Sequence, residues 1–175
     1  SFALGLHGPC VSFDTACSSS LVACHSGMRA IHHKENSKCL AAGVNMIFSP
    51  ASSASAALAG MTSPLGKSHT FDSRADGYAR SEACGTIVLQ TFSAEATKSS
   101  VSGCAVRQDG RSASLTAPNG LAQRDLISYA HETASCETHL VTNAEFHGTG
   151  TKLGDPIEVG SFSSAILEKL GDHRT

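Results

Sequence analysis

The sequence predicts a layered α/β fold, because segments typical of strands alternate along the chain with segments typical of helices. Some segments carry apolar residues at helical spacing, whereas others are short apolar runs bounded by turn residues. The chain has 175 residues, of which 41% are hydrophobic and 16% are charged. This composition is that of a folded core and not of a disordered segment or a coiled coil.

The first half of the chain contains two predicted strands, a helix and two segments of less regular sequence. We expect a short strand over residues 10–14, followed by a helix over residues 17–33, where apolar positions recur at helical spacing. Nearly continuous apolar sequence predicts a buried strand over residues 40–48. The Ser- and Ala-rich residues 49–60 are expected to form a short helix or an interface segment. Residues 61–80 have no periodicity and predict a long loop, which in a compact domain is usually functional.

The second half continues the alternation of strands and helices. Apolar runs predict strands over residues 84–92 and 101–106, and helical spacing predicts a helix over residues 121–133. A further strand is expected over residues 140–146, and it leads into a glycine-rich stretch. The last helix is expected over residues 155–167.

The start of that last helix carries three helix-start signals. Asp155 is expected at the N-cap, Pro156 at the first helical position and Glu158 at the third. Together they are typical of a capping box at the N-terminus of a helix.

Charge and hydropathy exclude two classes of partner. The net charge is −2 and the 13 Lys and Arg residues are scattered, so we expect no nucleic-acid partner. No apolar run approaches the about 20 residues that a membrane-spanning helix needs, so we expect no membrane partner. Asp14 and the lack of basic residues before it argue against a signal peptide. We expect a cytoplasmic protein, with an organelle left open, and a chain that is part of a longer one.

The cysteines indicate a reducing compartment. There are seven of them, an odd number, without any CxxC pair, which argues against a disulfide scaffold and against a zinc site. Most lie among Ala, Val and Leu, where cysteine behaves as a small buried hydrophobic residue. We therefore expect no metal, and one cysteine remains a candidate for a reactive group.

That candidate is Cys17, which falls where a predicted strand turns into a predicted helix, among small residues. This placement is similar to a nucleophile elbow, which lifts a side chain into a cleft beside the free N–H groups of a helix start. The alternative is a buried cysteine at a tightly packed helix start. A helix start activates a thiol only weakly, so a nucleophilic Cys17 also needs a basic partner.

His147 is the candidate for that partner, because it closes a predicted strand and begins the glycine-rich sequence HGTGTKLGDP. At the carboxyl edge of a sheet its imidazole would lie where α/β folds place ligands. A Walker A loop is excluded because Leu153 follows Lys152. A dinucleotide-binding loop remains open, with Asp172 as its acidic residue, as does a structural glycine turn.

Other polar residues favour structural roles. The histidines of the first helix, His25, His32 and His33, are explained better as exposed positions than as a metal site. A group of charged residues in and after the long loop is expected to form a salt-bridge network and not an acid/base pair; it comprises Asp72, Asp76, Arg80 and Glu82.

Eight motifs together resemble the ketosynthase (β-ketoacyl synthase) domain of type I polyketide synthases and animal-type fatty acid synthases. They occur in the same order over nearly the whole chain: GP at residues 8–9, DTACSSS at 14–20, AAGVNMIFSP at 41–50, GMTSP at 60–64, FDSRADGYAR at 71–80, QDGRS at 108–112, LTAPNG at 115–120 and HGTGTKLGDPIEV at 147–159. The resemblance identifies residues 1–175 as the central part of one such domain, from just before the nucleophile to just after the first histidine segment.

The resemblance implies a thiolase-like α/β/α fold, present here as an incomplete fragment, and an acyltransferase activity. Cys17 matches the nucleophile that accepts an acyl chain as a thioester. His147 matches the first catalytic histidine, which helps to decarboxylate a malonyl-type extender. Thr149 and Thr151 match positions that contact the phosphopantetheine arm of an acyl carrier protein. No cofactor is expected to bind directly.

The implied partners are the acyl carrier protein, acyltransferase and other synthase domains in cis or in trans, and a second copy in a homodimer. The implied function is decarboxylative condensation in polyketide biosynthesis. Three alternatives remain, namely fatty acid elongation by the same chemistry, a non-elongating acyl-binding domain without the second histidine, and a cysteine hydrolase.

Two features depart from the family pattern. Ser81 and Ala83 stand where the family has glycines, and Arg107 replaces the usual asparagine before the QDG sequence. The family's lysine and second histidine are expected beyond Thr175. We therefore expect the isolated chain to be inactive and to fold poorly, with open sheet edges and exposed apolar surface.

Overall fold

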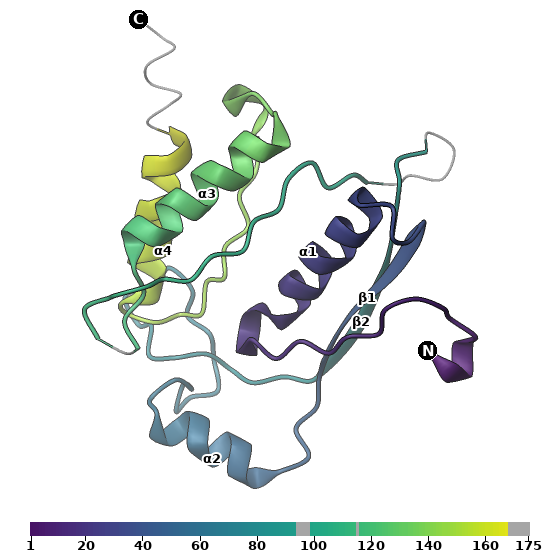
Figure 1. Cartoon of the computed structure of the whole chain (residues 1–175). Helices are drawn as coiled ribbons and strands as arrows, with labels where there is room; N and C mark the ends of the chain where they lie inside the picture. Colours follow the sequence, from purple (N-terminus) through teal and green to yellow (C-terminus); the bar gives the residue numbers. More distant parts are fainter. Residues whose placement is uncertain (94–98, 115, 168–175) are drawn as a thin grey trace, which may run out of the picture. The chain divides into compact units, whose positions relative to one another are not determined.

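The computed structural model describes residues 1–93, 99–114 and 116–167, which divide into two compact units (Figure 1). One unit consists of Ser1–Met46 and Glu82–Val101, and the other of Ile47–Ser81 and Ser102–Thr175. Leu115, the first residue of the LTAPNG motif, and Asp172, the acidic residue of the dinucleotide hypothesis, lie outside the described residues.

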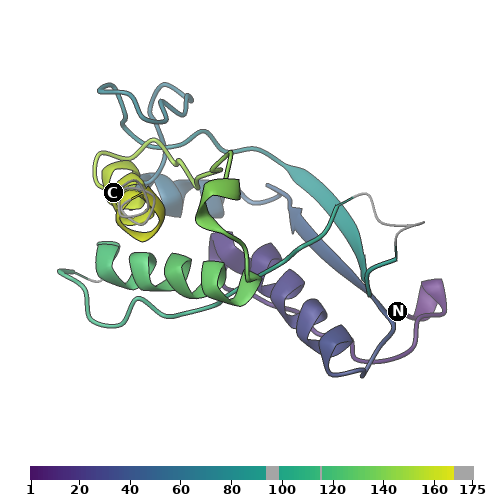
Figure 2. The ribbon, with the colours of Figure 1, turned by 90° about the horizontal axis from the view of Figure 1, so that it is seen from above.

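The first unit is a helix packed on a two-stranded antiparallel sheet. The short turn η1 (Phe2–Leu4) opens the chain, and the turn η2 (Ala16–Ser18) leads directly into the helix α1 (Ser19–His32). Strand β1 (Lys38–Asn45) pairs with β2 (Ala83–Gln90), with Lys38 opposite Gln90 and Asn45 opposite Ala83. Figure 2 shows α1 lying along this sheet. The helix predicted over residues 17–33 and the strands predicted over residues 40–48 and 84–92 are confirmed here, with ends shifted by one to three residues.

Gly27 sets the close approach of α1 to the sheet. It is the buried residue of α1, and a Cβ placed on it would lie 2.8 Å from the Cys39 Sγ and 3.1 Å from the Leu89 Cδ1. A side chain at this position would therefore force the helix away from the strands. The face of the sheet with Cys39 and Leu89 is thus the one that α1 covers.

The opposite face of the sheet is exposed, which corrects the expectation of a fully buried strand. Side chains alternate between the two faces of a strand. Leu40 and Val44 on β1 are 42% and 70% exposed, and Val88, which pairs with Leu40, is 62% exposed. The sequence of β1 is as apolar as that of a buried strand, but in the described residues only one face of the sheet packs against a helix.

The second unit contains the remaining helices. Helix α2 (Pro50–Leu58) has Ser49 as its N-cap residue, and the Ser49 side chain accepts a hydrogen bond from the Ala51 N–H. The long predicted loop follows, and Thr62 and Tyr78 form a single parallel bridge across it. Helix α3 (Gly120–Ala134) packs against α4 (Gly154–Phe162) and against its π-helical continuation η4 (Ser163–Leu167), and the short turn η3 (Thr138–Leu140) lies between α3 and α4 in the chain.

Three predicted strands are wrong: residues 10–14, 101–106 and 140–146 are not strands in the structure. A strand is defined by hydrogen bonds to a neighbour, and β1 and β2 are the only paired strands among the described residues. The segment 101–106 instead lies against α3, where a Cβ on Gly103 would come within 2.9 Å of the Ala134 Cβ. The apolar run therefore did not indicate strand pairing, and Val106 remains 41% exposed although the segment lies against a helix.

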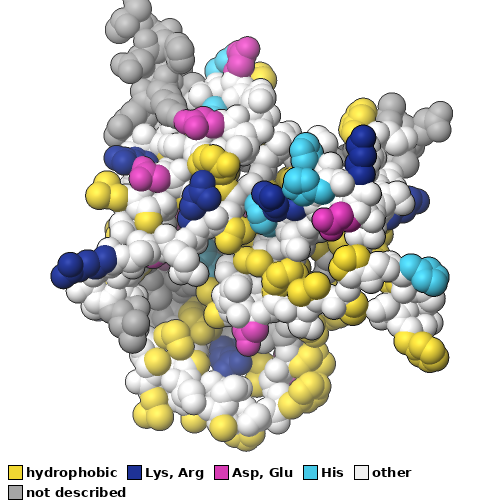
Figure 3. Space-filling view, in the orientation of Figure 1, with side chains coloured by type: hydrophobic (Ala, Val, Ile, Leu, Met, Phe, Trp, Pro, Cys, Tyr) yellow, Lys and Arg dark blue, Asp and Glu magenta, His cyan; other side chains and the backbone are white. Residues whose placement is uncertain are grey.

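Large apolar side chains remain on the surface of both units. Phe2, Phe48 and Leu58 are at least 83% exposed, and hydrophobic side chains gather over the α2 region in Figure 3. Side chains that are buried, such as Ala165 and Ile166, are few and mostly small. The expected exposed apolar surface is present, and the folding of the isolated chain stays a prediction.

The cysteines differ from the expectation of burial. All seven are free thiols; Cys10, Cys17 and Cys84 are exposed and the other four are partly exposed. Among the described residues, no helix combines the length and the apolar character that crossing a bilayer requires.

Candidate functional site

Cys17 lies in a sharp turn at the entrance to α1. The residue before it, Ala16, has a φ of 56°, a left-handed conformation that a residue with a side chain adopts only at a cost. Cys17 is exposed and occupies the middle of η2, where the N–H groups of a helix start lack partners within the helix. The structure thus has a sharp turn into a helix at Cys17, but the strand that the expected elbow requires is not present at residues 10–14.

Side chains from the same short segment hold this turn. Ser19 Oγ accepts a hydrogen bond from the Thr15 N–H at 2.9 Å and donates to the Ala16 carbonyl at 2.7 Å. Ser18 Oγ donates to the Thr15 carbonyl at 3.0 Å and lies 2.8 Å from the Thr15 Oγ1. The Asp14 carboxylate accepts a bond from the Ala16 N–H at 3.3 Å. Residues of the DTACSSS motif therefore hold the turn around Cys17 by hydrogen bonds among themselves.

The loop that carries His147 is held by a carboxylate from α4. The two oxygens of Glu158 accept hydrogen bonds from the N–H groups of His147, at 2.6 Å, and Gly148, at 3.0 Å. The sequence pattern predicted that Glu158 caps its own helix, and the structure corrects this. The carboxylate instead fixes the backbone of the candidate catalytic histidine.

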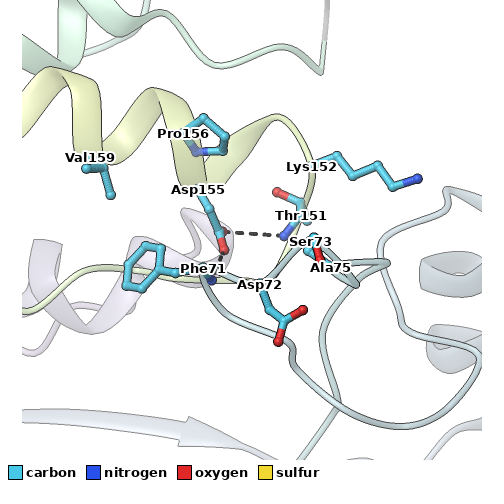
Figure 4. Close-up of a pocket in the computed structure, with 9 residues that line it drawn as sticks. All are labelled: Phe71, Asp72, Ser73, Ala75, Thr151, Lys152, Asp155, Pro156 and Val159. Carbon is cyan, nitrogen blue, oxygen red and sulfur yellow. Dashed lines mark hydrogen bonds between the residues drawn. The ribbon is translucent and has the colours of Figure 1, made fainter.

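Asp155 makes a second bridge to the same loop. Its Oδ1 accepts from the N–H groups of Gly150 at 3.1 Å and Thr151 at 3.4 Å, and its Oδ2 accepts from the Phe71 N–H at 2.9 Å (Figure 4). Asp155 is only 5% exposed, so these amides supply the hydrogen bonds that a buried carboxylate requires. The expectation of an N-cap at Asp155 is wrong, because α4 begins at Gly154 and its N-cap residue is Leu153.

The segment 69–79 lies along the loop that carries His147 and is joined to it by hydrogen bonds. Thr70 Oγ1 donates to the Gly148 carbonyl at 2.5 Å, and the Gly77 N–H donates to the Gly150 carbonyl at 3.0 Å. Gly148 and Gly150 have φ values of 54° and 69°, and a Cβ on Gly150 would lie 3.0 Å from the His69 N. The glycines are required both for the turn and for the close approach of the two segments.

Thr149 and Thr151 place two hydroxyls side by side. Their Oγ1 atoms are 3.4 Å apart, and the Thr151 Oγ1 accepts a hydrogen bond from the Gly154 N–H at 3.0 Å. Because the Thr151 Oγ1 accepts this bond through a lone pair, its own O–H can donate, either to the Thr149 Oγ1 or to a ligand. The pair could therefore bind a ligand with amide or carbonyl groups.

A cavity of about 410 Å³ opens beside this loop. It lies between residues 71–75 and the first turns of α4, and Asp155 forms part of its wall (Figure 4). Its walls are mainly apolar, with Lys152 extending away from the hydrogen-bonded carboxylate in Figure 4. Its lining comprises Phe71, Asp72, Ser73, Ala75, Thr151, Lys152, Asp155, Pro156 and Val159.

Two of the charged residues expected to form one salt-bridge network have other partners in the structure. Asp72 pairs with Arg74 at 2.7 Å, a partner that the sequence-based prediction left out, and Arg80 reaches the Ser53 Oγ at 3.5 Å. The hydrogen bond from the Arg74 side chain holds the pKa of Asp72 well below its usual range. Within residues 1–93, 99–114 and 116–167, no group of three His, Cys, Asp or Glu side chains is arranged to hold a metal ion.

The four predicted site residues fall into both units. His147, Thr149 and Thr151 lie together on one loop of the second unit, and Cys17 lies in the first unit. Sequence reasoning missed the positions that hold the histidine loop in place, which include Thr70, Phe71 and Gly77. The FDSRADG motif drew attention to this segment but gave no role for its residues.

Family models match almost the entire chain. Residues 1–95 match the β-ketoacyl synthase N-terminal domain, and residues 98–174 match the β-ketoacyl synthase C-terminal domain. The two matches together define the class of domain, a ketosynthase domain. The chain belongs to the β-ketoacyl synthase family.

Individual relatives are polyketide synthases. The chain is 43% identical over 169 residues to a phenolphthiocerol/phthiocerol polyketide synthase of Mycobacterium tuberculosis, covering 93% of this chain and 9% of the relative. It is 40% identical over 180 residues to the polyketide synthase PksN of Bacillus subtilis (strain 168), covering 98% of this chain and 3% of that protein. The chain thus spans less than a tenth of the length of these relatives.

Solved ketosynthase structures share the fold. The ketosynthase from module 6 of the bacillaene synthase of Bacillus subtilis 168 matches with a TM-score of 0.86 and 39% identity, over 96% of this chain and 31% of that one. The oxazolomycin ketosynthase domain from Streptomyces albus JA3453 matches with a TM-score of 0.89 and 34% identity, over 95% of this chain and 30% of that one. The expected thiolase-like fold, present in part, is confirmed.

Proposed function

We propose that the protein containing this chain is a β-ketoacyl synthase of polyketide biosynthesis, with Cys17 as the acyl-accepting nucleophile. The observation that carries the proposal is the turn at Cys17, where an exposed thiol follows the left-handed Ala16 at the start of a helix. The names of the relatives favour a polyketide product over fatty acid elongation.

The reaction would proceed in two stages. The Cys17 thiol loses its proton, and the resulting thiolate attacks the thioester carbonyl of an acyl chain on a phosphopantetheine arm. The carrier sulfur leaves as a thiolate and takes up a proton. A malonyl-type thioester then loses CO₂, and His147 donates a hydrogen bond to the enolate oxygen that forms. The enolate carbon attacks the acyl–Cys17 carbonyl, which releases the thiolate and a β-ketoacyl thioester. Covalent storage thus separates the condensation into two easier steps.

The hydroxyls of Thr149 and Thr151 would bind the amide groups of the phosphopantetheine arm. Their spacing of 3.4 Å and their place on the His147 loop support this role. The proposed partners are accordingly an acyl carrier protein, the other domains of the synthase and a second copy in a homodimer. We propose no directly bound cofactor or metal.

Intact-protein mass spectrometry on the complete synthase tests the assignment of Cys17. Incubation with an acyl carrier thioester should add one acyl group to the wild-type protein and none to a Cys17→Ala variant. Cys10→Ser, which changes another exposed cysteine of the same unit, is the matched control and should load normally. Undiminished loading of Cys17→Ala would refute the assignment.

Decarboxylation of a malonyl carrier thioester tests the role of His147 separately. His147→Ala should lower the rate by about 10² to 10⁴-fold, the usual contribution of a general acid or base. His139→Ala, at an exposed histidine of the same unit, should not change it. If the wild-type protein decarboxylates the malonyl thioester and accepts an acyl group but does not extend the chain, this result would instead favour the non-elongating alternative.

A further inference from the structure

Phe71 is a strained residue beside the His147 loop. Its φ of 57° puts a bulky aromatic residue in the left-handed region. Such a conformation persists only where the surrounding structure over-determines it, and it occurs preferentially at functional sites. Phe71 is 56% exposed, so burial of its ring does not account for the strained backbone.

The backbone of Phe71 is held by the carboxylate that also holds the histidine loop. Its N–H donates to the Asp155 Oδ2 at 2.9 Å, while the Asp155 Oδ1 accepts from the Gly150 N–H at 3.1 Å. One buried side chain therefore connects residue 71 to residue 150.

The ring of Phe71 makes a second connection. It meets the ring of Phe146 edge to face, with centroids 5.5 Å apart and planes at 88°. Phe146 in turn meets Phe162, the last residue of α4, at 5.4 Å and 81°. Phe146 is the residue directly before His147, so the aromatic contacts reach the peptide that leads into the histidine.

We propose that Phe71 is a positioning residue for His147. In the left-handed conformation observed, its N–H donates to Asp155 while its ring contacts Phe146. Glu158 holds the His147 N–H from the opposite side, so the backbone of the histidine is fixed between α4 and the segment 69–79. The inference rests on the proposed function of His147, and Phe71 itself touches no reacting atom.

The test uses the complete synthase and measures two rates, malonyl decarboxylation and acyl loading of Cys17. Phe71→Ala should lower the kcat of decarboxylation about ten- to a hundredfold, because small displacements of a catalytic group have effects of this size. The KM for the malonyl thioester and the loading rate should stay within about twofold, since neither depends on the orientation of the His147 ring.

Two variants complete the comparison. Phe71→Tyr keeps the ring and should restore decarboxylation, whereas Leu65→Ala, at a 71% exposed apolar residue of the same loop, should change neither rate. If Phe71→Ala is recovered unfolded, Phe71→Leu, which keeps apolar bulk without a ring, replaces it.

The proposal is overturned if the Phe71 variant lowers both rates in proportion, if decarboxylation does not change, or if tyrosine fails to rescue it. A failure of the proposed function has a different signature. It would appear with Phe71 intact, as normal decarboxylation by His147→Ala or normal loading of Cys17→Ala.

Discussion

The Cys17 turn and the His147 loop are held in place in opposite ways. Around Cys17, the hydrogen bonds join residues that are two to four positions apart in sequence. Around His147, the Glu158 carboxylate reaches back 11 positions, and the bond from Phe71 to Asp155 spans 84. The nucleophile turn is thus built by its own motif, whereas the histidine loop needs two other segments of the chain.

This difference matters for what a substitution can do. A hydroxyl at the Cys17 turn makes neutral hydrogen bonds at an exposed position, each worth about 1 kcal/mol. Asp155 and Glu158 accept bonds as carboxylates, and such bonds are roughly twice as strong. We therefore expect the histidine loop to be the more sensitive of the two regions to the loss of a single side chain.

Asp155→Ala should have the largest effect on stability. It leaves the N–H groups of Phe71, Gly150 and Thr151 without their acceptor, and we expect a loss of about 3–5 kcal/mol in the free energy of unfolding. Chemical denaturation of the complete synthase domain measures this loss. Asp125→Ala, at an exposed carboxylate on α3, is the control, and a loss no larger than that of the control would contradict the account.

Glu158→Gln should have a smaller effect on stability and a clear effect on the proposed chemistry. Glutamine keeps one acceptor but turns an NH₂ group toward one of the two amides, at a cost of about 1–3 kcal/mol. We expect about a tenfold decrease in malonyl decarboxylation with unchanged loading of Cys17. Glu132→Gln, on the exposed surface of α3, should behave as the wild type. An equal fall of both rates would speak against a specific hold on His147.

Ser19→Ala should affect the other region only. It removes the bond from the Thr15 N–H and the bond to the Ala16 carbonyl, so we expect a loss of about 1–2 kcal/mol and slower loading of Cys17. Ser20→Ala, at the next residue, is the matched control. Quenched-flow acylation assays on both variants measure the loading rate, and slower decarboxylation in Ser19→Ala would argue against the distinction between the two regions.

The smallest effect is expected for the exposed ion pair of the long loop. Arg74 lowers the pKa of Asp72 in the folded protein, so the pair stabilises the fold above the unfolded pKa of about 3.9. This stabilisation is lost as the pH falls below that value. Arg74→Ala should therefore lower the stability slightly at neutral pH and make it depend less on pH below about pH 4, where the pair no longer contributes. Acid titration followed by circular dichroism compares the two proteins.

The same contrast explains how far the sequence predicted the molecule. The Cys17 turn and the helix after it follow from residues that are neighbours in sequence, and both were predicted. Glu158 and Asp155 were interpreted as helix caps, because a local pattern shows a carboxylate at a helix start but not a distant amide that it accepts from. The strands expected at residues 101–106 and 140–146 failed for a related reason, since an apolar run does not specify a pairing partner, which is a tertiary feature.

Arg107 shows a departure from the family pattern that sequence alone could not interpret. Its guanidinium lies 4.3 Å from the centre of the Tyr129 ring on α3, a cation–π contact worth about 0.5–1 kcal/mol at an exposed site. The residue therefore attaches the QDGRS segment to α3. The partner became evident only when the packing of α3 was known.

The central claim is that the Cys17 turn and the His147 loop are held by separate sets of hydrogen bonds. Hydrogen exchange of the complete synthase with Asp155→Asn tests this claim most directly. The account predicts that peptides covering residues 70–72 and 147–152 exchange about tenfold faster or more, because their amides lose a buried acceptor. Peptides covering residues 15–19 should exchange as in the wild type. Faster exchange at both places, or at neither, would contradict the account.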